Sequence, residues 1–158
     1  MTQVSGVQSR FLIAASSCLI IGMLVSAKQP DPFAYRFVMT PEEGPIDRMI
    51  DKRHTAAFTK CQDQAVTTHS NELCFAEEFV RQDQMLNQTW REVVARAAPR
   101  FHKKLLSAQR KWAAQRDPFC RSKADEFRGG TIAPVVYTDC RVEQTIRRTI
   151  WLEKLRVR

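Results

Sequence analysis

Four cysteines after residue 27 constrain the fold of this chain more than any other feature. They are Cys61, Cys74, Cys120 and Cys140, and each stands beside a stretch with helical periodicity. An apolar leader precedes them, which indicates export to a compartment where disulfides form and persist. Four cysteines allow three pairings, and the sequence alone does not choose between them. The chain is therefore expected to be exported, oxidised and helical.

The leader has the layout of a signal peptide. An apolar run from Phe11 to Val25 leads to Val25-Ser26-Ala27, where small residues stand at the positions that a signal peptidase recognises. We predict a signal peptide over residues 1–27, a periplasmic or secreted location, and a mature chain from Lys28 that does not span a membrane. An uncleaved membrane anchor is the alternative, although the run is short for one. A lipid-modified Cys18 is disfavoured because the apolar run continues past it.

No metal site or cofactor is expected. The chain has no Cys-x-x-Cys pair, and none of His54, His69 and His102 lies at ligand spacing from a cysteine. The pair Gly129-Gly130 lacks the context of a phosphate-binding loop.

No catalytic constellation stands out either. A hydrolase needs a paired acid and base or an activated nucleophile. We interpret Glu77 and Glu78 as part of a solvated helix face. Ser107 has no potential catalytic base at a spacing that indicates an activated nucleophile. The sequence therefore favours a binding protein over an enzyme.

The N-terminal extension comprises residues 28–57, and its first part, residues 28–45, is rich in proline and is predicted to be loop. Within it, apolar residues from Ile46 onwards predict one short amphipathic helix that runs towards Cys61. Three long helices follow, over about 72–97, 99–117 and 134–155.

Local signals set the expected ends of these helices. Ser70 or Asn71 is a suitable N-cap for the first long helix. Asp117-Pro118 is expected to end the second, because the residue before a proline avoids helical backbone angles. Apolar stripes mark the buried faces: Phe79, Asp83, Leu86, Trp90, Val93 and Ala97; Phe101, Leu105, Ala108, Trp112 and Gln115; Val135, Val142, Ile146 and Ile150.

The predicted fold class is all-α, an up-down-up bundle of three helices with an additional short N-terminal helix. Short connections make successive helices antiparallel. This topology brings all four cysteines to one end of the bundle, so two disulfides staple that end. We favour the local pairs Cys61–Cys74 and Cys120–Cys140, each worth about 3 kcal/mol by loop closure.

Charge is distributed unevenly along the chain, whose formal net charge is +8. Residues 61–95 have a net charge of −4, whereas residues 100–123 have +7 and residues 141–158 have +4. A basic face of this kind attracts polyanions such as envelope polymers. The alternative is a solvated face that keeps the domain soluble.

Polar residues interrupt the expected seam between the first two long helices. Asp83 occupies a position of the apolar stripe, and Asn87 lies one turn further on. A buried carboxylate needs a partner, and arginine offers a matching planar fork. We favour an ion pair that fixes helix register, since buried polar groups are normally satisfied internally; a small binding site is the alternative. The predicted seam comprises Asp83, Asn87, Gln109, Arg110, Trp112 and Arg116.

The same residues carry a family resemblance. The chain resembles the lysozyme inhibitor LprI-like N-terminal domain of small exported bacterial proteins, over about residues 58–155. The matching residues are Phe58, Cys61, Ala65, Thr67 or Thr68, Glu72, Cys74, Asp83, Leu86, Asn87 and Trp90, then Gln109-Arg110-x-Trp112-x-x-x-Arg116-x-x-x-Cys120, Gly129-Gly130-Thr131, Cys140, Thr145 and Arg148. Trp90 stands where tyrosine is more usual. The resemblance implies a disulfide-stapled helical domain over residues 58–158, outside the cytoplasm.

Two binding functions follow as hypotheses. The resemblance implies a protein of the cell envelope that binds or inhibits a lysozyme-type enzyme. The charge pattern implies instead a module that binds an anionic envelope polymer or another envelope protein, and the leader disfavours nucleic acid. The candidate surface for this module is a basic and aromatic face on the last helix, with Arg147, Trp151, Lys154 and Arg158. The alternative is that Trp151 packs against residues 46–58.

Overall fold

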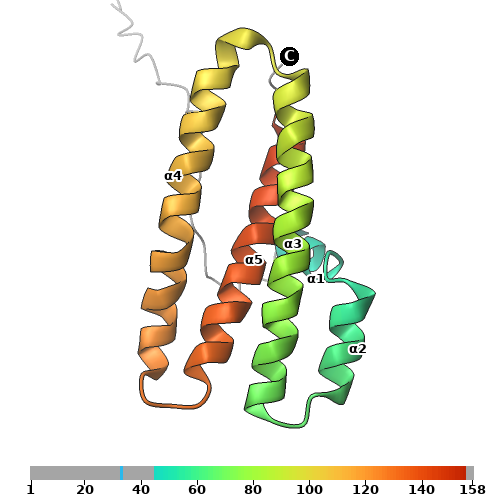
Figure 1. The fold of residues 1–158 in the computed structure, drawn as a ribbon, viewed down its shortest axis with the longest axis vertical. Coiled ribbons are helices and arrows are strands. Elements are labelled where there is room, and N and C mark those ends of the chain that lie inside the picture. The colour runs from blue at the N-terminus through green and yellow to red at the C-terminus, as the bar shows by residue number, and fades with distance from the viewer. Residues whose placement is uncertain (1–32, 34–44, 156–158) are drawn as a thin grey trace, which may run out of the picture.

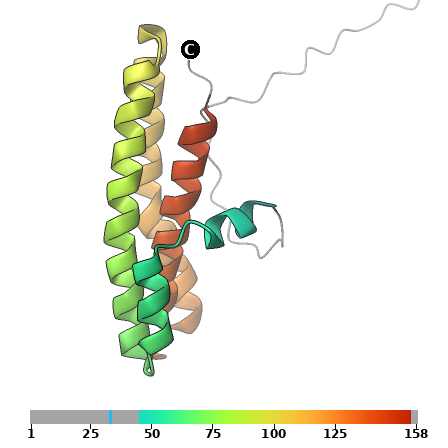
Figure 2. The same ribbon diagram turned by 90° about the vertical axis from the view of Figure 1, so that its right-hand side faces the viewer.

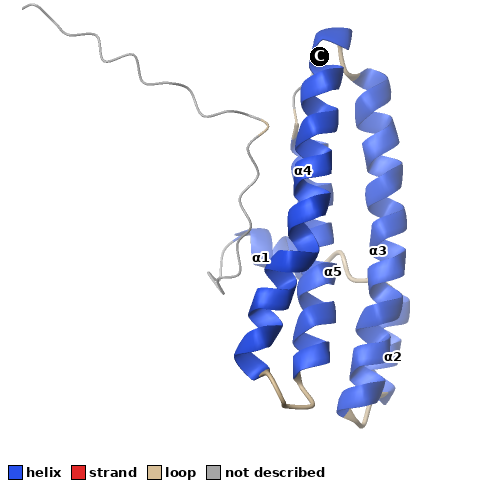
Figure 3. Cartoon of the chain, turned by 60° about the vertical axis from the view of Figure 1, so that its left-hand side comes forward, coloured by secondary structure: helices blue, strands red, loops and turns tan. Residues whose placement is uncertain are grey.

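The computed structural model describes Phe33 and residues 45–155, and every regular element within them is helical (Figure 1, Figure 3). The expected all-α fold, with three long helices arranged up-down-up, is confirmed. In chain order the elements are α1 (Pro45–Asp51), α2 (Ala56–Gln64), α3 (Thr68–Arg96), α4 (Pro99–Ala124), a 3-10 turn (Asp125–Phe127) and α5 (Ala133–Lys154).

The last helix, α5, is the central one. It packs closely along both α3 and α4, whereas α3 and α4 make few close backbone approaches to each other. Figure 1 shows α5 between them, and Figure 2 shows it set to one side of the α3–α4 pair. Eleven of its 22 residues are buried, against five of 29 in α3 and three of 26 in α4. The predicted inward residues of this helix, Val135, Val142, Ile146 and Ile150, are all buried.

Two apolar clusters hold the bundle together. Burying each large apolar side chain contributes about 1.5–3 kcal/mol. The cluster towards the α3–α4 turn includes Phe33 from the N-terminal extension, whose ring centroid lies 6.1 Å from that of Phe101. The second cluster joins α1 to α5. Their buried members are Phe33, Leu86, Val93, Ala97, Leu105, Trp112 and Leu152 in the first, and Ile50, Val142, Ile146 and Ile150 in the second.

The N-terminus of α3 lies earlier than predicted. Thr67 is the N-cap, and its side chain accepts a hydrogen bond from the backbone N–H of Ser70. The Ser70 hydroxyl accepts in return from the backbone N–H of Thr67, at 3.0 Å. Ser70 therefore takes part in the cap as its reciprocal partner.

The predicted end of the second long helix at Asp117-Pro118 was wrong, because α4 continues through Pro118 to Ala124. A proline inside a helix removes one backbone hydrogen bond. Pro118 is exposed, whereas Trp112 and Cys120 on either side of it are buried. Packing on α5 and the disulfide of Cys120 therefore outweigh the local preference of the proline.

The single short helix predicted before Cys61 is in fact two helices, α1 and α2. The break falls at His54 and Thr55, where the Thr55 side chain caps α2 by accepting from the N–H of Phe58 at 3.1 Å. The same hydroxyl and the backbone N–H of Thr55 both donate to Glu78 of α3. This long-range contact holds Thr55 in an extended conformation, which a local pattern does not show.

The two disulfides join Cys61 to Cys74 and Cys120 to Cys140. The pairing that we favoured from the sequence is therefore confirmed. Both bridges lie at the end of the bundle that holds the α2–α3 and α4–α5 connections (Figure 1). We call this end the stapled pole.

The described helices include none with the length and apolar character needed to cross a membrane. The predicted signal peptide, residues 1–27, lies outside the described residues.

Candidate functional site

The predicted polar seam gathers around Asp83, between α3 and α4. Its Oδ1 atom lies 3.4 Å from Nη1 of Arg116, and its Oδ2 atom accepts a hydrogen bond from Asn87 at 3.0 Å. The Asp83 side chain is 41% exposed and that of Arg116 is 12% exposed. The structure thus brings the carboxylate, the amide and one guanidinium together, on an open edge of the bundle.

Arg116 and Arg141 continue the seam towards the stapled pole. Both pair with Asp117, at 2.8 Å from Arg116 and 3.3 Å from Arg141. Their guanidinium groups also lie near the ring of Phe79, at 4.7 and 3.7 Å from its centroid. Two guanidinium groups thus face two carboxylates, Asp83 and Asp117, so no charge is left over to attract an ion. This balance supports a role in fixing helix register.

The other predicted seam residues separate into two groups. Trp112 is buried, and Gln109 accepts a hydrogen bond from Nε of Arg148 at 2.9 Å. Arg148 is fully buried, with its guanidinium carbon 4.0 Å from the Trp151 ring centroid and 5.6 Å from that of Trp112. Arg110 instead points to solvent on α4 and takes no part in the seam.

A second polar cluster, which sequence reasoning missed, surrounds Glu78. This side chain is completely buried, so its interpretation as part of a solvated face was wrong. Its Oε1 atom accepts from the backbone N–H of Thr55 at 2.9 Å and from Gln82 at 2.7 Å. Its Oε2 atom accepts from the Thr55 hydroxyl at 2.5 Å and from Nε of Arg81 at 2.9 Å. Both oxygens are therefore satisfied, and α2 is tied to α3.

The sequence did contain a signal for this cluster. Cys74, Glu78, Gln82 and Leu86 recur at steps of four, and all four are buried. A disulfide cysteine fixes one face of a helix inward, and residues four apart share a face. In its first part the predicted stripe was displaced by one residue, because Glu78 and Gln82 are buried and Asp83 lies at the edge towards α4, whereas its later members Leu86, Val93 and Ala97 are buried as predicted.

Burial and hydrogen bonding act in opposite directions on Glu78. Desolvation by itself raises the pKa of a carboxyl group, but the hydrogen bonds from Gln82, Thr55 and Arg81 outweigh it and leave the pKa of Glu78 below its usual value of 4.5. Desolvation also lowers the pKa of neighbouring His54, against the attraction of Glu78. The cluster therefore holds a carboxylate anion beside a neutral imidazole at neutral pH.

The predicted basic and aromatic face of the last helix is not an open cationic surface. Arg147 is largely buried and forms an ion pair with Glu143, at 2.6 Å. Trp151 is partly buried against the apolar cluster that contains Phe33. Lys154 is exposed, and Arg158 lies outside the described residues.

The stapled pole carries an exposed apolar surface on α3 and the loop before it. Val66, in the loop closed by the Cys61–Cys74 disulfide, is 92% exposed. Leu73 and Val80 are 51% and 55% exposed. Glu77 of the same helix is 66% exposed at its side chain, and Glu72 is 35% exposed. We call Val66, Leu73, Val80, Glu72 and Glu77 the α3 pole surface.

The described residues contain no group of three or more histidine, cysteine or acidic side chains that could hold a metal ion. The fold defines a small helical domain that two disulfides staple at one end.

Comparison with known proteins identifies the family. The family model described as lysozyme inhibitor LprI matches residues 59–152, so the chain belongs to this family, which is a family of inhibitors and not of enzymes. A protein of Rhizobium meliloti (strain 1021), described as uncharacterized protein R02472, is 30% identical over 105 residues, which cover 58% of this chain and 76% of that protein. No solved structure matches the chain.

Proposed function

We propose that this protein is exported and binds and inhibits a lysozyme-type enzyme of the cell envelope. Membership of the LprI family is the observation that carries the proposal. The two disulfides support a periplasmic or secreted location, because such bonds persist in oxidising compartments. The predicted signal peptide over residues 1–27 accounts for the export.

The α3 pole surface is our candidate for the contact with the enzyme. A disulfide closes its loop, which lowers the conformational entropy lost on binding. Val66 stands at the tip of this loop, and Leu73 continues the apolar surface onto α3. A rigid apolar tip of this kind is suited to enter the substrate cleft of an enzyme.

Charge favours this side of the bundle. Many lysozymes are basic, and a partner that is also basic associates more slowly because like charges repel. Glu72 gives the α3 pole surface an acidic group, and Glu77 adds a second, which Arg81 shares with buried Glu78 at 3.5 Å from Glu77. The basic helix α4 lies on the opposite side from α2 (Figure 1). Glu78 contributes nothing here because it is buried.

A lysis assay with mature, oxidised protein tests the proposal. We expect inhibition of at least one class of lysozyme, and we expect the double variant Val66→Ser/Leu73→Ser to weaken it about tenfold or more, as at an interface centre. Leu106→Ser is the control, since Leu106 is exposed to 42% but lies on α4.

Two results would overturn the proposal. The first is the absence of inhibition and of binding for every lysozyme class at high molar excess. The second concerns the contact surface alone. An equal loss of inhibition in Leu106→Ser and in Val66→Ser/Leu73→Ser would show that the α3 pole surface is not the contact site.

A further inference from the structure

The outer face of α4 is a long basic surface. Its six cationic residues fall within a sector of about 120° around the helix axis at about 100° per residue, so they share one side of the helix. All six are exposed, and none forms an ion pair with another described residue. At 1.5 Å per residue the row extends for about 30 Å. Its members, which we call the α4 basic row, are Arg100, Lys103, Lys104, Arg110, Lys111 and Arg121.

The α4 basic row contains no acid, and the large apolar side chain exposed beside it is Leu106, three residues after Lys103. The acidic residue on α4 is Asp117, which pairs with Arg116 and Arg141 in the seam. Between the cations the same side presents Ser107, Ala114 and Pro118. Insertion into the boundary region of a membrane needs a continuous apolar face, and a single exposed leucine does not provide one. A narrow row of cations is suited instead to a chain-like anion that can lie along it.

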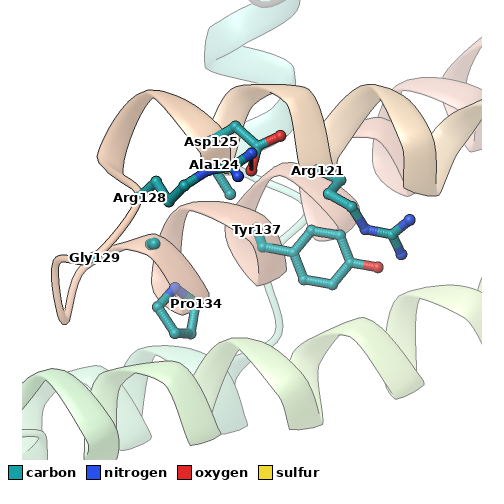
Figure 4. A pocket seen from close by; sticks show the side chains of 8 residues that line it. Arg121, Ala124, Asp125, Arg128, Gly129, Pro134 and Tyr137 are labelled. Carbon is teal, nitrogen blue, oxygen red and sulfur yellow. Dashed lines mark ion pairs between the residues drawn. The ribbon is translucent and has the colours of Figure 1, made fainter.

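An open pocket lies where this row meets the stapled pole. It has a volume of about 340 Å³ and lies between the end of α4 and the start of α5 (Figure 4). Figure 4 shows the ring of Tyr137 and the side chain of Arg121 extending towards the same side, with Pro134 and Gly129 at the other. Arg121 therefore belongs both to the row and to the pocket. The pocket residues are Arg121, Ala124, Asp125, Arg128, Gly129, Ala133, Pro134 and Tyr137.

The lining of this pocket has the chemistry of a saccharide site. The half-buried Tyr137 offers an aromatic ring and a hydroxyl, and Arg121 offers a guanidinium that can bind a carboxylate by two hydrogen bonds. Asp125, paired with Arg128 at 2.9 Å, adds an acceptor for sugar hydroxyls. Gly129 has a φ of 85°, and a side chain added there would meet no atom within 4 Å. The loop at Gly129 therefore leaves space in the pocket for a sugar ring.

We propose that the pocket and the α4 basic row form a binding site for a linear polysaccharide whose sugars carry carboxylates. One sugar ring lies in the pocket against Tyr137 with its carboxylate on Arg121. The neighbouring carboxylates of the polymer follow the row towards Arg100. This site is on the other side of the bundle from the α3 pole surface, so it does not depend on inhibition of any enzyme.

Titration of mature, oxidised protein with polygalacturonate oligosaccharides tests the proposal. The expected result is binding that weakens steeply with added salt, because exposed charges are screened. Neutral chitin oligosaccharides of the same length are expected to bind at least tenfold more weakly. In an amide NMR spectrum, the signals of Gly129 and Tyr137 are expected to move on addition of the acidic sugar.

Three variants of equal charge identify the site. Arg121→Gln and Lys111→Gln remove one cation from the pocket and from the row, and each is expected to weaken binding severalfold. Arg91→Gln is the matched control, since Arg91 is exposed on α3 and forms no ion pair with another described residue. Thermal unfolding of each variant checks that all three remain folded.

Three results would overturn this inference. An effect of Arg91→Gln as large as that of Arg121→Gln would mean that net charge alone attracts the polymer. Equal binding of neutral chitin oligosaccharides would exclude recognition of the carboxylates. Tighter binding of polyphosphate or of vesicles rich in acidic phospholipid than of the acidic sugar would assign the surface to phosphate groups instead.

Discussion

Glu78 and Asp83 are acids little more than one turn apart on α3, yet they differ in every physical respect. Glu78 is fully buried with both oxygens satisfied by Thr55, Arg81 and Gln82, whereas the side chain of Asp83 is 41% exposed. The nearest guanidinium atom lies 2.9 Å from Glu78 and 3.4 Å from Asp83. The difference shows that neighbouring elements decide what a carboxylate does. Helix α2 and its cap close over Glu78, and α4 leaves Asp83 at an open edge.

The largest expected effect is the loss of the Glu78 carboxylate. Glu78→Ala leaves the Thr55 backbone N–H without its acceptor and removes one of the two partners of the Gln82 amide and of the Arg81 guanidinium, which costs about 3 kcal/mol in the free energy of unfolding. Urea denaturation monitored by circular dichroism measures it. Glu77→Ala is the control, because the neighbouring side chain is 66% exposed and is expected to change stability by less than about 0.5 kcal/mol. Equal effects of the two variants would contradict the buried network.

A smaller effect is expected in the pH dependence of stability. The folded-state pKa of Glu78 lies below 4.5, so the folded protein binds this proton less readily than the unfolded chain does. The contribution is complete above about pH 4.5 and is lost as the pH falls through the lowered folded-state pKa. Glu78→Gln removes the ionisable group and with it this pH-dependent contribution to the free energy of unfolding. Its unfolding free energy should therefore fall less steeply than that of the natural protein between about pH 5 and pH 3; parallel curves would contradict the assignment.

The smallest expected effect is at Asp83. Asp83→Ala removes one partly exposed ion pair and one hydrogen bond, worth about 1 kcal/mol together. The melting temperature should fall by a few degrees, and differential scanning calorimetry measures it. A loss as large as that of Glu78→Ala would show that Asp83 is as essential to the fold. An unchanged melting temperature with loss of binding would instead make the seam part of a functional surface.

The sequence predicted the helices and the stapled pole well because both follow from local or covalent rules. Helical periodicity placed α3 and α5, and the topology of three antiparallel helices brought the cysteines to one end. It failed where long-range contacts outweigh local preference. Pro118 does not end α4, because Trp112 and Cys120 are anchored on α5, and α1 and α2 are separate because Thr55 is held by Glu78.

The candidate binding surfaces were predicted less well than the fold. Cations on the last helix were expected to form an open face, but Arg147 pairs with Glu143, and the exposed cations gather on α4 instead. A sequence gives the spacing of charges along each helix, but not which helix lies at the centre of the bundle. The central position of α5 buries Arg148 and Trp112 and turns the basic side of α4 to solvent.

By itself, the sequence determined the helical class, the oxidised cysteines and the family, since these depend on periodicity, on cysteine spacing within helices and on an ordered set of residues. Only the tertiary structure decided which carboxylate is buried, where α4 ends and which cations remain exposed. The physical reason is that burial of a side chain requires two structural elements to pack against each other. A side chain loses its water only when another part of the chain packs over it.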